Sequence, residues 1–287
     1  MKKISILLVL AVLLMLFGCA PSATPQIVAT TKPVYDFTTY LCSGTNLTVG
    51  QLITDGVSCL HDFSLNVGQV KNAEAAQVMV ISGAGLEDFM EDLLSGCDTV
   101  IDSSKDIALL QCAEEHDHHD HHHEADSHIW LAPENAKQMA VNICDGLCQA
   151  YPDHADTFRA NLGKLTLELD ALQAYGEEAL ADLSCQELIT FHDGFSYLAY
   201  AFDLTITAAI EEESGSEASA KELIELIELV QSHGVPAIFA EVNGSVSAPG
   251  IISRETGVSV HQLNMGMEGN YFEIMRYNID TLKEALG

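Results

Sequence analysis

Short apolar segments alternate with longer amphipathic segments along the chain, and this alternation occurs twice. The first half has four short runs rich in apolar and β-branched residues, at 27–31, 47–52, 78–82 and 99–102. After residue 185 four more runs follow, at 188–191, 205–209, 237–240 and 259–263, with helical patterns at 220–232 and 271–285. Strands that alternate with helices favour parallel sheets, so the sequence predicts an α/β protein with two lobes.

One long helical pattern lies between the two lobes. Its apolar residues are three and four positions apart and no proline interrupts it: Phe158, Leu162, Leu165, Leu169 and Leu172. This spacing places them on one face of a helix, and a helix of this length is a stiff connection. We therefore expect lobes at 19–154 and 185–287, joined by a rigid helix over 155–184.

The first eighteen residues have the pattern of a lipoprotein signal peptide. Lys2 and Lys3 precede an unbroken apolar run at 6–17, and Gly18 precedes Cys19. The run is shorter than the roughly 20 residues that a membrane-spanning helix needs. We expect residues 1–18 to be removed and Cys19 to be acylated, which would anchor the chain outside the cytoplasmic membrane. A plain secretion signal is the alternative.

The chain is strongly acidic. Its net charge is −30, and loss of Lys2 and Lys3 with the signal peptide would lower this to −32. Such a field repels phosphate backbones and attracts cations, so nucleic acid is excluded as a partner and a cation is favoured. There are eight cysteines. If Cys19 carries lipid, an odd number remains, so at least one is unpaired.

Histidines are concentrated in one segment, EEHDHHDHHHEADSHIW at 114–130. Neutral imidazole is a common ligand of zinc and also suits copper, nickel and iron, whereas carboxylates alone favour magnesium or calcium. We expect a solvated loop at 114–124 with several weak metal sites, formed by His116, His118, His119, His121, His122 and His123. His128 differs because the apolar pair Ile129-Trp130 follows it, and we expect it to be held in place.

Three isolated histidines lie where parallel α/β sheets bind ligands. His61 follows the second predicted strand, His192 follows the strand at 188–191, and His128 precedes a helix that begins near Pro133. Ligands of such sheets sit beyond the carboxyl ends of the strands. Because these histidines belong to different lobes, the sequence predicts a metal site in the cleft between the lobes.

Several motifs, in their order and spacing, resemble those of the solute-binding lipoproteins of zinc and manganese ABC importers. They are HDF at 61–63, GAGLE at 83–87, DSHIWLAP at 126–133, FHDGF at 191–195, SAKEL at 219–223, FAE at 239–241, ETG at 255–257 and MRYN at 275–278. The resemblance covers nearly all of the chain after the signal peptide. It implies two Rossmann-like lobes joined by a long helix, with one metal ion at their interface.

The resemblance implies that His61, His128 and His192 are metal ligands. Members of the family that favour manganese often have a carboxylate at the position of His192. Three imidazoles suit zinc better, because zinc prefers nitrogen ligands at about 2.0 to 2.1 Å. We therefore expect Zn²⁺, with Mn²⁺ as the alternative ion, since some members with three histidines also take manganese.

The fourth ligand departs from the family pattern. Where the family usually has an aspartate, this chain has Asn264, and a neutral amide is a poor zinc ligand. Water is the first choice for the fourth position, and Glu268 or a histidine of the loop at 114–124 is the alternative. Asn264 would then hydrogen-bond the water. The resemblance also places Glu241 next to the ligands rather than on the metal.

Together these features predict a receptor that binds zinc outside the cytoplasmic membrane and delivers it to an ABC permease and its ATPase, without catalysing a reaction. One alternative is a manganese receptor of the same family, and another is a surface adhesin or metal-storage lipoprotein. The least favoured is a hydrolase, in which three histidines and a water form the zinc centre. The sequence has no HisGluXaaXaaHis motif to supply its general base.

Overall fold

The computed structural model describes residues 25–54, 63–110, 125–210 and 219–287. The predicted signal peptide, Cys19, His61 and the histidine-rich segment at 114–124 lie outside the described residues. Among the helices that are described, none is both long enough and apolar enough to cross a membrane.

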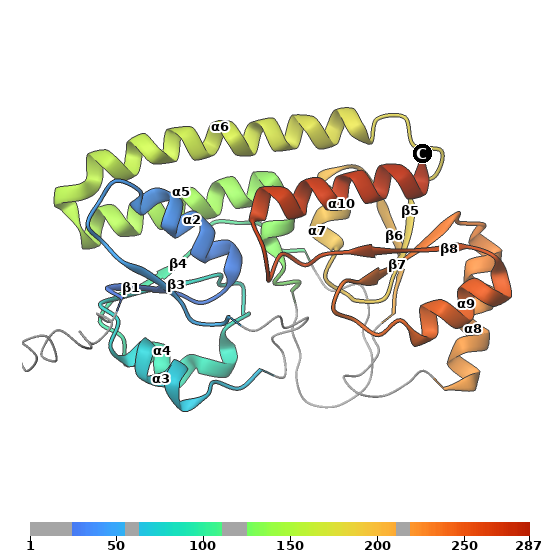
Figure 1. Cartoon of the computed structure of the whole chain (residues 1–287), viewed down its shortest axis with the longest axis horizontal. Coiled ribbons are helices and arrows are strands. Elements are labelled where there is room, and N and C mark those ends of the chain that lie inside the picture. The colour runs from blue at the N-terminus through green and yellow to red at the C-terminus, as the bar shows by residue number, and fades with distance from the viewer. Residues whose placement is uncertain (1–24, 55–62, 111–124, 211–218) are drawn as a thin grey trace, which may run out of the picture.

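The first lobe is built on a parallel four-stranded sheet with the order β2-β1-β3-β4. Its strands are β1 (Ile27–Ala29), β2 (Val49–Gln51), β3 (Val78–Ile81) and β4 (Val100–Asp102). Its helices are α2 (Lys32–Cys42), α3 (Val67–Glu74), the 3₁₀ turn η1 (Asp88–Met90), α4 (Glu91–Ser95) and α5 (Pro133–Ala150). Helices α2 and α5 lie on one side of the sheet, and α3 and α4 lie on the other (Figure 1).

The second lobe repeats this arrangement with a parallel sheet of the order β6-β5-β7-β8. Its strands are β5 (Glu187–Thr190), β6 (Thr205–Ala209), β7 (Ala237–Glu241) and β8 (Ser259–Leu263). Its helices are α7 (Ser196–Ala201), α8 (Ala220–His233), α9 (Ser247–Thr256) and α10 (Tyr271–Leu286). In both sheets the first strand lies between the second and the third. The strand order therefore reverses once in each, which is where such sheets collect ligands.

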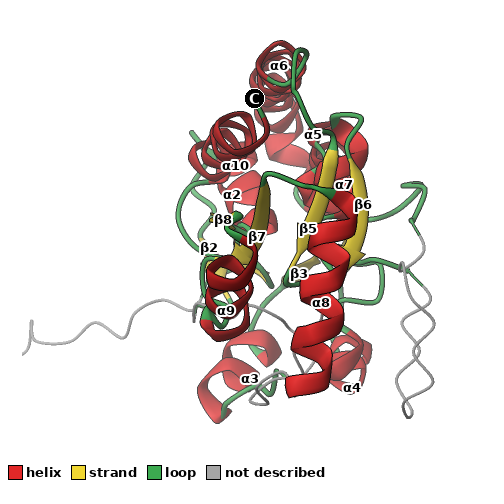
Figure 2. Ribbon diagram, turned by 90° about the vertical axis from the view of Figure 1, so that its right-hand side faces the viewer, coloured by secondary structure: helices red, strands yellow, loops and turns green. Residues whose placement is uncertain are grey.

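Helix α6 (Ala155–Ala179) runs along both lobes. Figures 1 and 2 show α6 and α10 on the side of the molecule opposite to α3 and α4. Tyr40 of α2 donates a hydrogen bond to Glu168 at 2.6 Å, and Tyr175 donates one to Asp280 of α10. Side chains thus tie the helix to each lobe. The prediction of two parallel α/β lobes joined by a long rigid helix is confirmed.

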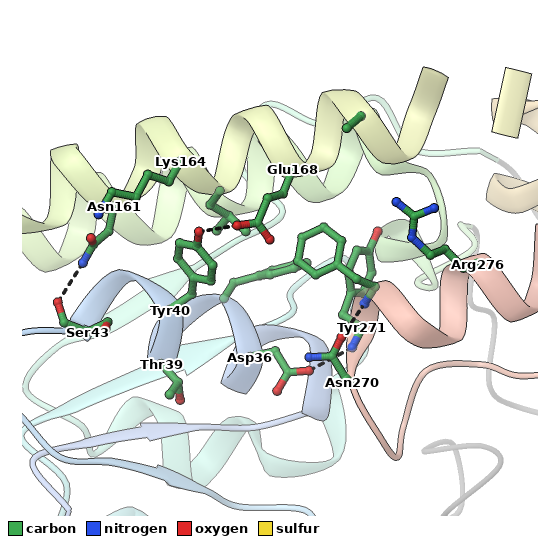
Figure 3. A pocket seen from close by; sticks show the side chains of 14 residues that line it. Asp36, Thr39, Tyr40, Ser43, Asn161, Lys164, Glu168, Asn270, Tyr271 and Arg276 are labelled. Atoms are coloured by element: carbon green, nitrogen blue, oxygen red, sulfur yellow. Dashed lines mark hydrogen bonds between the residues drawn. The ribbon is translucent and has the colours of Figure 1, made fainter. Parts of the chain in front are cut away.

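An open cavity of about 850 Å³ lies between α2, α6 and α10 (Figure 3). Hydrogen bonds across it join the three helices. Asn161 of α6 donates to the carbonyl oxygen of Ser43 at 2.8 Å, and Asp36 of α2 accepts from the backbone amide of Tyr271 at 3.1 Å. The cavity therefore marks the place where the first lobe, the connecting helix and the second lobe meet.

Local sequence signals set the starts of several helices. Asn66 accepts hydrogen bonds from the amides of Gly68 and Gln69 at 2.8 and 3.1 Å, and the Gln69 side chain accepts from the Asn66 amide at 2.8 Å. This capping box begins α3, and Ser219 and Glu222 form the same motif at the start of α8. Each box satisfies amides that the first helical turn leaves without partners.

The connecting helix ends earlier than its sequence pattern predicts. The pattern predicts a helix to 184, but the chain leaves the helix at Leu180, directly after Ala179. The backbone amides of Ser184 and Cys185 then donate to the carbonyl oxygen of Leu286, at 2.9 and 3.2 Å. The end of α10 supplies the hydrogen bonds that another helical turn would have formed. The short turn η3 (Pro152–His154) joins the other end of α6 to α5.

One apolar core extends through both lobes and α6. Its largest buried side chains come from each part, with Phe37 and Trp130 from the first lobe, Phe158 from α6 and Phe195 from the second lobe. The rings of Phe37 and Tyr271 meet across the lobes with centroids 4.9 Å apart. Because the buried surface is continuous, separating the lobes would expose apolar side chains to water.

A buried carboxyl group holds the turn that follows β3. Glu87 accepts hydrogen bonds from the Thr30 hydroxyl at 2.6 Å and from the amides of Ser82 and Gly83 at 2.8 and 2.9 Å. The turn needs this support because Ala84 has a φ of 55°, in a region that favours glycine. Burial raises the pKa of Glu87 to about 7, although the three hydrogen bonds oppose the rise.

Two glycines of α6 allow a matched test of its packing. A Cβ atom at Gly176 would lie 2.2 Å from Cε1 of Phe202, whereas one at Gly163 would meet nothing within 4 Å. We expect Gly176→Ala to lower the free energy of unfolding by roughly 1 to 3 kcal/mol through overpacking. Gly163→Ala should raise it by about 0.5 to 1 kcal/mol. Urea unfolding would measure both, and equal effects would contradict the contact of α6 with Phe202.

The replacement Glu87→Gln tests the buried carboxyl group. Because burial raises the pKa of Glu87 from 4.5 to about 7, the folded chain holds this proton more tightly than the unfolded chain. The resulting stability is complete below pH 4.5 and is lost as the pH rises through 7. Between pH 5 and pH 8 we expect the wild-type free energy of unfolding to fall by roughly 2 to 3 kcal/mol relative to the variant. Urea titrations at each pH would measure this, and the same pH dependence of the free energy of unfolding in wild type and Glu87→Gln would refute it.

Candidate metal centre

His128 lies directly before the 3₁₀ turn η2 (Ile129–Leu131) in the first lobe. The three residues of this turn are each at most 1 % exposed, and they anchor the segment in the core. Pro133 then begins α5, which suits a proline because the first turn of a helix needs no amide from it. His128 itself is 4 % exposed. The apolar residues that follow it thus place a histidine inside the protein.

Asp126 fixes the orientation of the His128 ring. Its Oδ1 lies 2.8 Å from the backbone amide of His128 and 2.8 Å from Nδ1 of the ring. Burial acts to raise the pKa of Asp126, but the bonds from His128 and from the Ser196 side chain hold it below its usual value. The carboxylate therefore stays ionised and accepts a hydrogen bond from the Nδ1–H group of the ring. This leaves the lone pair of Nε2 for a metal ion, the arrangement seen in many metal sites.

His192 approaches His128 from the second lobe. It follows β5, and the Thr190 hydroxyl donates to its carbonyl oxygen at 3.0 Å. The rings of His128 and His192 have centroids 5.5 Å apart and an interplanar angle of 83°. Two of the three predicted ligands are thus neighbours across the two lobes. His61, the third, lies outside the described residues, as do the six loop histidines.

Gly194 allows these two rings to come together. A Cβ atom at this position would lie 2.4 Å from Cε of Met265, 2.8 Å from Cδ2 of His192 and 3.0 Å from Cε1 of His128. Real Cβ atoms do not make contacts this short, so a larger residue would move the imidazoles or Met265. The backbone at Gly194 therefore forms one wall of the space beside the two histidines.

Glu241 places a second carboxyl group close to His128. It lies at the end of β7 and is 4 % exposed. Burial raises the pKa of Glu241 to about 7, while the nearby His128 acts in the opposite direction. This carboxyl group thus changes charge near neutral pH, in contrast to Asp126. A bound cation would favour its ionised form.

Asn264 and Glu268 belong to the turn between β8 and α10. The backbone amide and carbonyl of Asn264 both bond to the Asn278 side chain at 2.8 Å, and its side-chain oxygen accepts from the Gly266 amide at 2.8 Å. Asn264 therefore stabilises the turn. Its side-chain amide nitrogen would be the group that hydrogen-bonds a metal-bound water. Glu268 is exposed. Whether either residue contributes to a metal site stays a prediction.

The described residues contain part of the predicted site. Among them no three His, Cys, Asp or Glu side chains form a group arranged to hold a metal ion, and the third predicted histidine lies outside them. Sequence reasoning missed Asp126 and Gly194. An acid two residues before a histidine was a usable local signal for Asp126. The role of Gly194 depends on Met265, which approaches only in the folded chain.

Comparisons with known proteins show the family to which the chain belongs. A profile of the family described as ZnuA, zinc-uptake complex component A, periplasmic, matches residues 27–285. The zinc-binding lipoprotein AdcA of Streptococcus pneumoniae is 32% identical over 309 residues, covering 99% of this chain and 61% of AdcA. The chain thus spans about three fifths of the length of that relative.

Solved structures show the same fold. The Zn(II)-bound ZnuA-like domain of Streptococcus pneumoniae AdcA has a TM-score of 0.79 and 28% identity, covering 92% of this chain and 99% of that domain. The laminin-binding adhesin Lmb from Streptococcus agalactiae has a TM-score of 0.80 and 24% identity, covering 92% and 100%, a likeness that shows the fold alone. Since the family profile matches all but the ends of the chain, the chain belongs to the ZnuA family of periplasmic zinc-uptake components.

Proposed function

We propose that this chain is an extracytoplasmic receptor that captures Zn²⁺ between its lobes and passes it to an ABC permease driven by an ATPase. The observation that carries the proposal is the pairing of His128 and His192 across the lobes, with ring centroids 5.5 Å apart. Asp126 supports it by fixing His128 as a nitrogen donor to a metal. A ligand set shared between two lobes suits a cargo that must be held and then released.

Zinc is the proposed ion because imidazole nitrogen is a preferred zinc ligand. The name of the zinc-binding lipoprotein AdcA and the Zn(II)-bound state of its ZnuA-like domain support this choice. Mn²⁺ is the alternative ion, because the sequence resembles receptors of both zinc and manganese importers; a Mn-bound metal-binding protein from candidatus Liberibacter asiaticus shares the fold. Manganese generally prefers oxygen ligands. The two imidazoles that meet in this cleft therefore favour zinc.

The proposed ligands are His61, His128 and His192, with water as the fourth. Glu268 and a histidine of the segment at 114–124 are the alternatives for the fourth position. Glu241, close to His128 and buried, would add negative charge beside the cation without binding it. Asn264 would hydrogen-bond the metal-bound water through its side-chain amide nitrogen.

The proposal includes attachment to a membrane through lipid at Cys19. The order of two lysines, an apolar run at 6–17, glycine and cysteine supports it, as does the lipoprotein name of the relative AdcA. The segment at 114–124 would collect zinc outside the cleft, because its closely spaced imidazoles offer several weak sites. Membership of a family of zinc-uptake components favours the receptor over the adhesin and the hydrolase.

A competition titration tests the ligands. The protein from Ala20 onward, with 114–124 deleted so that loop histidines do not mask the cleft, is titrated with Zn²⁺ and Mn²⁺ against a chromophoric chelator. We expect one tight zinc site, and a loss of affinity of about 100-fold or more in His128→Ala and in His192→Ala. His233→Ala is the matched control, because this half-exposed imidazole contacts Glu187 at 2.9 Å instead.

Two outcomes of this titration would overturn the assignment. Tight zinc binding that survives both ligand substitutions would place the metal elsewhere in the protein. Loss of all tight binding on deletion of 114–124 would make that segment the chelator and leave the cleft without a demonstrated role.

The substitution Gly194→Ala tests the close approach of the two rings. Its Cβ would lie 2.8 Å from the His192 ring and 3.0 Å from the His128 ring, so the His192 ring must shift and the His128 ring is crowded, and we expect zinc affinity to fall roughly tenfold or more. Gly250→Ala is the control, because a Cβ there would meet only Arg254, at 3.7 Å. The same titration measures the zinc affinity of each variant, and thermal melting shows whether each variant is folded. A folded Gly194→Ala protein with wild-type affinity would show that the rings do not need this space.

A further inference from the structure

The described residues on either side of the histidine-rich segment are hydrogen-bonded to each other beside the candidate metal centre. The backbone amide of Asp126 donates to the carbonyl oxygen of Leu110 at 2.9 Å. The hydroxyl of Tyr197 completes a ring of hydrogen bonds, because it accepts from the Leu110 amide at 2.9 Å and donates to the Asp126 carbonyl oxygen at 3.1 Å. The hydroxyl of Tyr197 thus bonds to Leu110 and to Asp126, the residues on either side of the segment.

These hydrogen bonds cross from one lobe to the other. Tyr197 lies on α7 in the second lobe, whereas Leu110 and Asp126 belong to the first. Tyr197 is 1 % exposed and Asp126 is 3 % exposed, so water does not compete for the bonds. Both donor and acceptor functions of the hydroxyl are used, which phenylalanine at this position would lack.

Asp126 connects Tyr197 to His128, the proposed metal ligand. Its backbone carbonyl accepts from Tyr197, and its carboxylate accepts from the ring and amide of His128 at 2.8 Å. The Ser196 side chain, next to Tyr197 on the same helix, also hydrogen-bonds to the Asp126 carboxylate. His192 precedes these residues in the same lobe. A short path of buried hydrogen bonds therefore connects the segment that bears His192 to the orientation of His128.

We propose that Tyr197 is an interlobe latch, a positioning residue whose hydroxyl sets how long a metal ion stays in the cleft. The proposal rests on the proposed function. The latch fixes Asp126 relative to the second lobe, so His128 and His192 keep their mutual geometry while the ion is bound. For the ion to leave, the His128 ring must move away from His192, and we expect this local movement to break the two hydrogen bonds of the Tyr197 hydroxyl. Removing the hydroxyl therefore accelerates release.

The test compares zinc release from full-length protein in detergent micelles. Each protein is loaded with one equivalent of Zn²⁺ and mixed with excess chromophoric chelator in a stopped-flow instrument. Weak sites in the segment at 114–124 release within the fast phase, and the slow phase reports the cleft. We expect Tyr197→Phe to increase the slow rate about tenfold, the change that corresponds to loss of a typical hydrogen bond.

Tyr271→Phe is the matched control. The Tyr271 hydroxyl is also buried and also crosses between the lobes, donating to the Trp130 carbonyl oxygen at 2.8 Å. Both variants lose one interlobe phenol, and both should melt at a lower temperature than wild type. Only Tyr197→Phe should release zinc faster, because the hydrogen bonds that orient the His128 ring come from Asp126, whereas Tyr271 bonds to the backbone of Trp130. A second readout is the visible spectrum of the Co²⁺ form, which should change in Tyr197→Phe because the His128 ring is less firmly oriented.

The proposal also predicts that Tyr197 acts through Asp126. We expect Asp126→Asn alone to release zinc faster, and in that background Tyr197→Phe should add little, so that the two effects are not additive. Wild-type release rates in Tyr197→Phe would overturn the latch, and so would equal acceleration in Tyr271→Phe. Full additivity with Asp126→Asn would overturn the path through Asp126. Absence of a slow phase in wild type would instead refute the proposed function itself.

Discussion

Trp130 is the residue on which the relation between the two lobes depends. Its indole nitrogen donates to the Met265 carbonyl oxygen at 2.7 Å, and its own carbonyl accepts from Tyr271 at 2.8 Å. Its ring packs against His128 with centroids 5.4 Å apart. This tryptophan is the only one in the chain. It belongs to the first lobe but is bonded to the second, so the same side chain that closes the interface also supports the first of the paired histidines.

Two buried carboxyl groups close to His128 behave in opposite ways. The pKa of Asp126 is held low by hydrogen bonds from His128, despite its burial. Burial without such bonds raises the pKa of Glu241 to about 7. Asp126 thus has a permanent structural charge, which sets the tautomer of the ring. Glu241 is only partly ionised near neutral pH, and a cation that binds nearby favours its ionised form. The high net acidity of the chain adds a long-range attraction for cations to the effect of these two nearby groups.

Much of the fold follows from local sequence patterns, because alternating apolar runs and amphipathic helices encode the two parallel sheets and α6. The pairing of His128 with His192 follows too, since both were placed beyond the carboxyl ends of strands or at a helix start. What local patterns do not contain is long-range contact. The end of α6 at Ala179 depends on Leu286, and the roles of Gly194 and Tyr197 depend on residues of the other lobe. His61 and the segment at 114–124 remain predictions from sequence.

The ties of α6 to both lobes have a consequence for the thermodynamics of binding. Tyr40, Glu168, Tyr175 and Asp280 hold the helix at two places, and the core beneath it is continuous. The conformational entropy lost in bringing the two lobes together is therefore lost during folding, before any ion arrives. A preorganised site converts more of its contact energy into affinity. Selectivity then depends on whether an ion fits the existing spacing of donors, because reshaping that spacing would require deforming the helix.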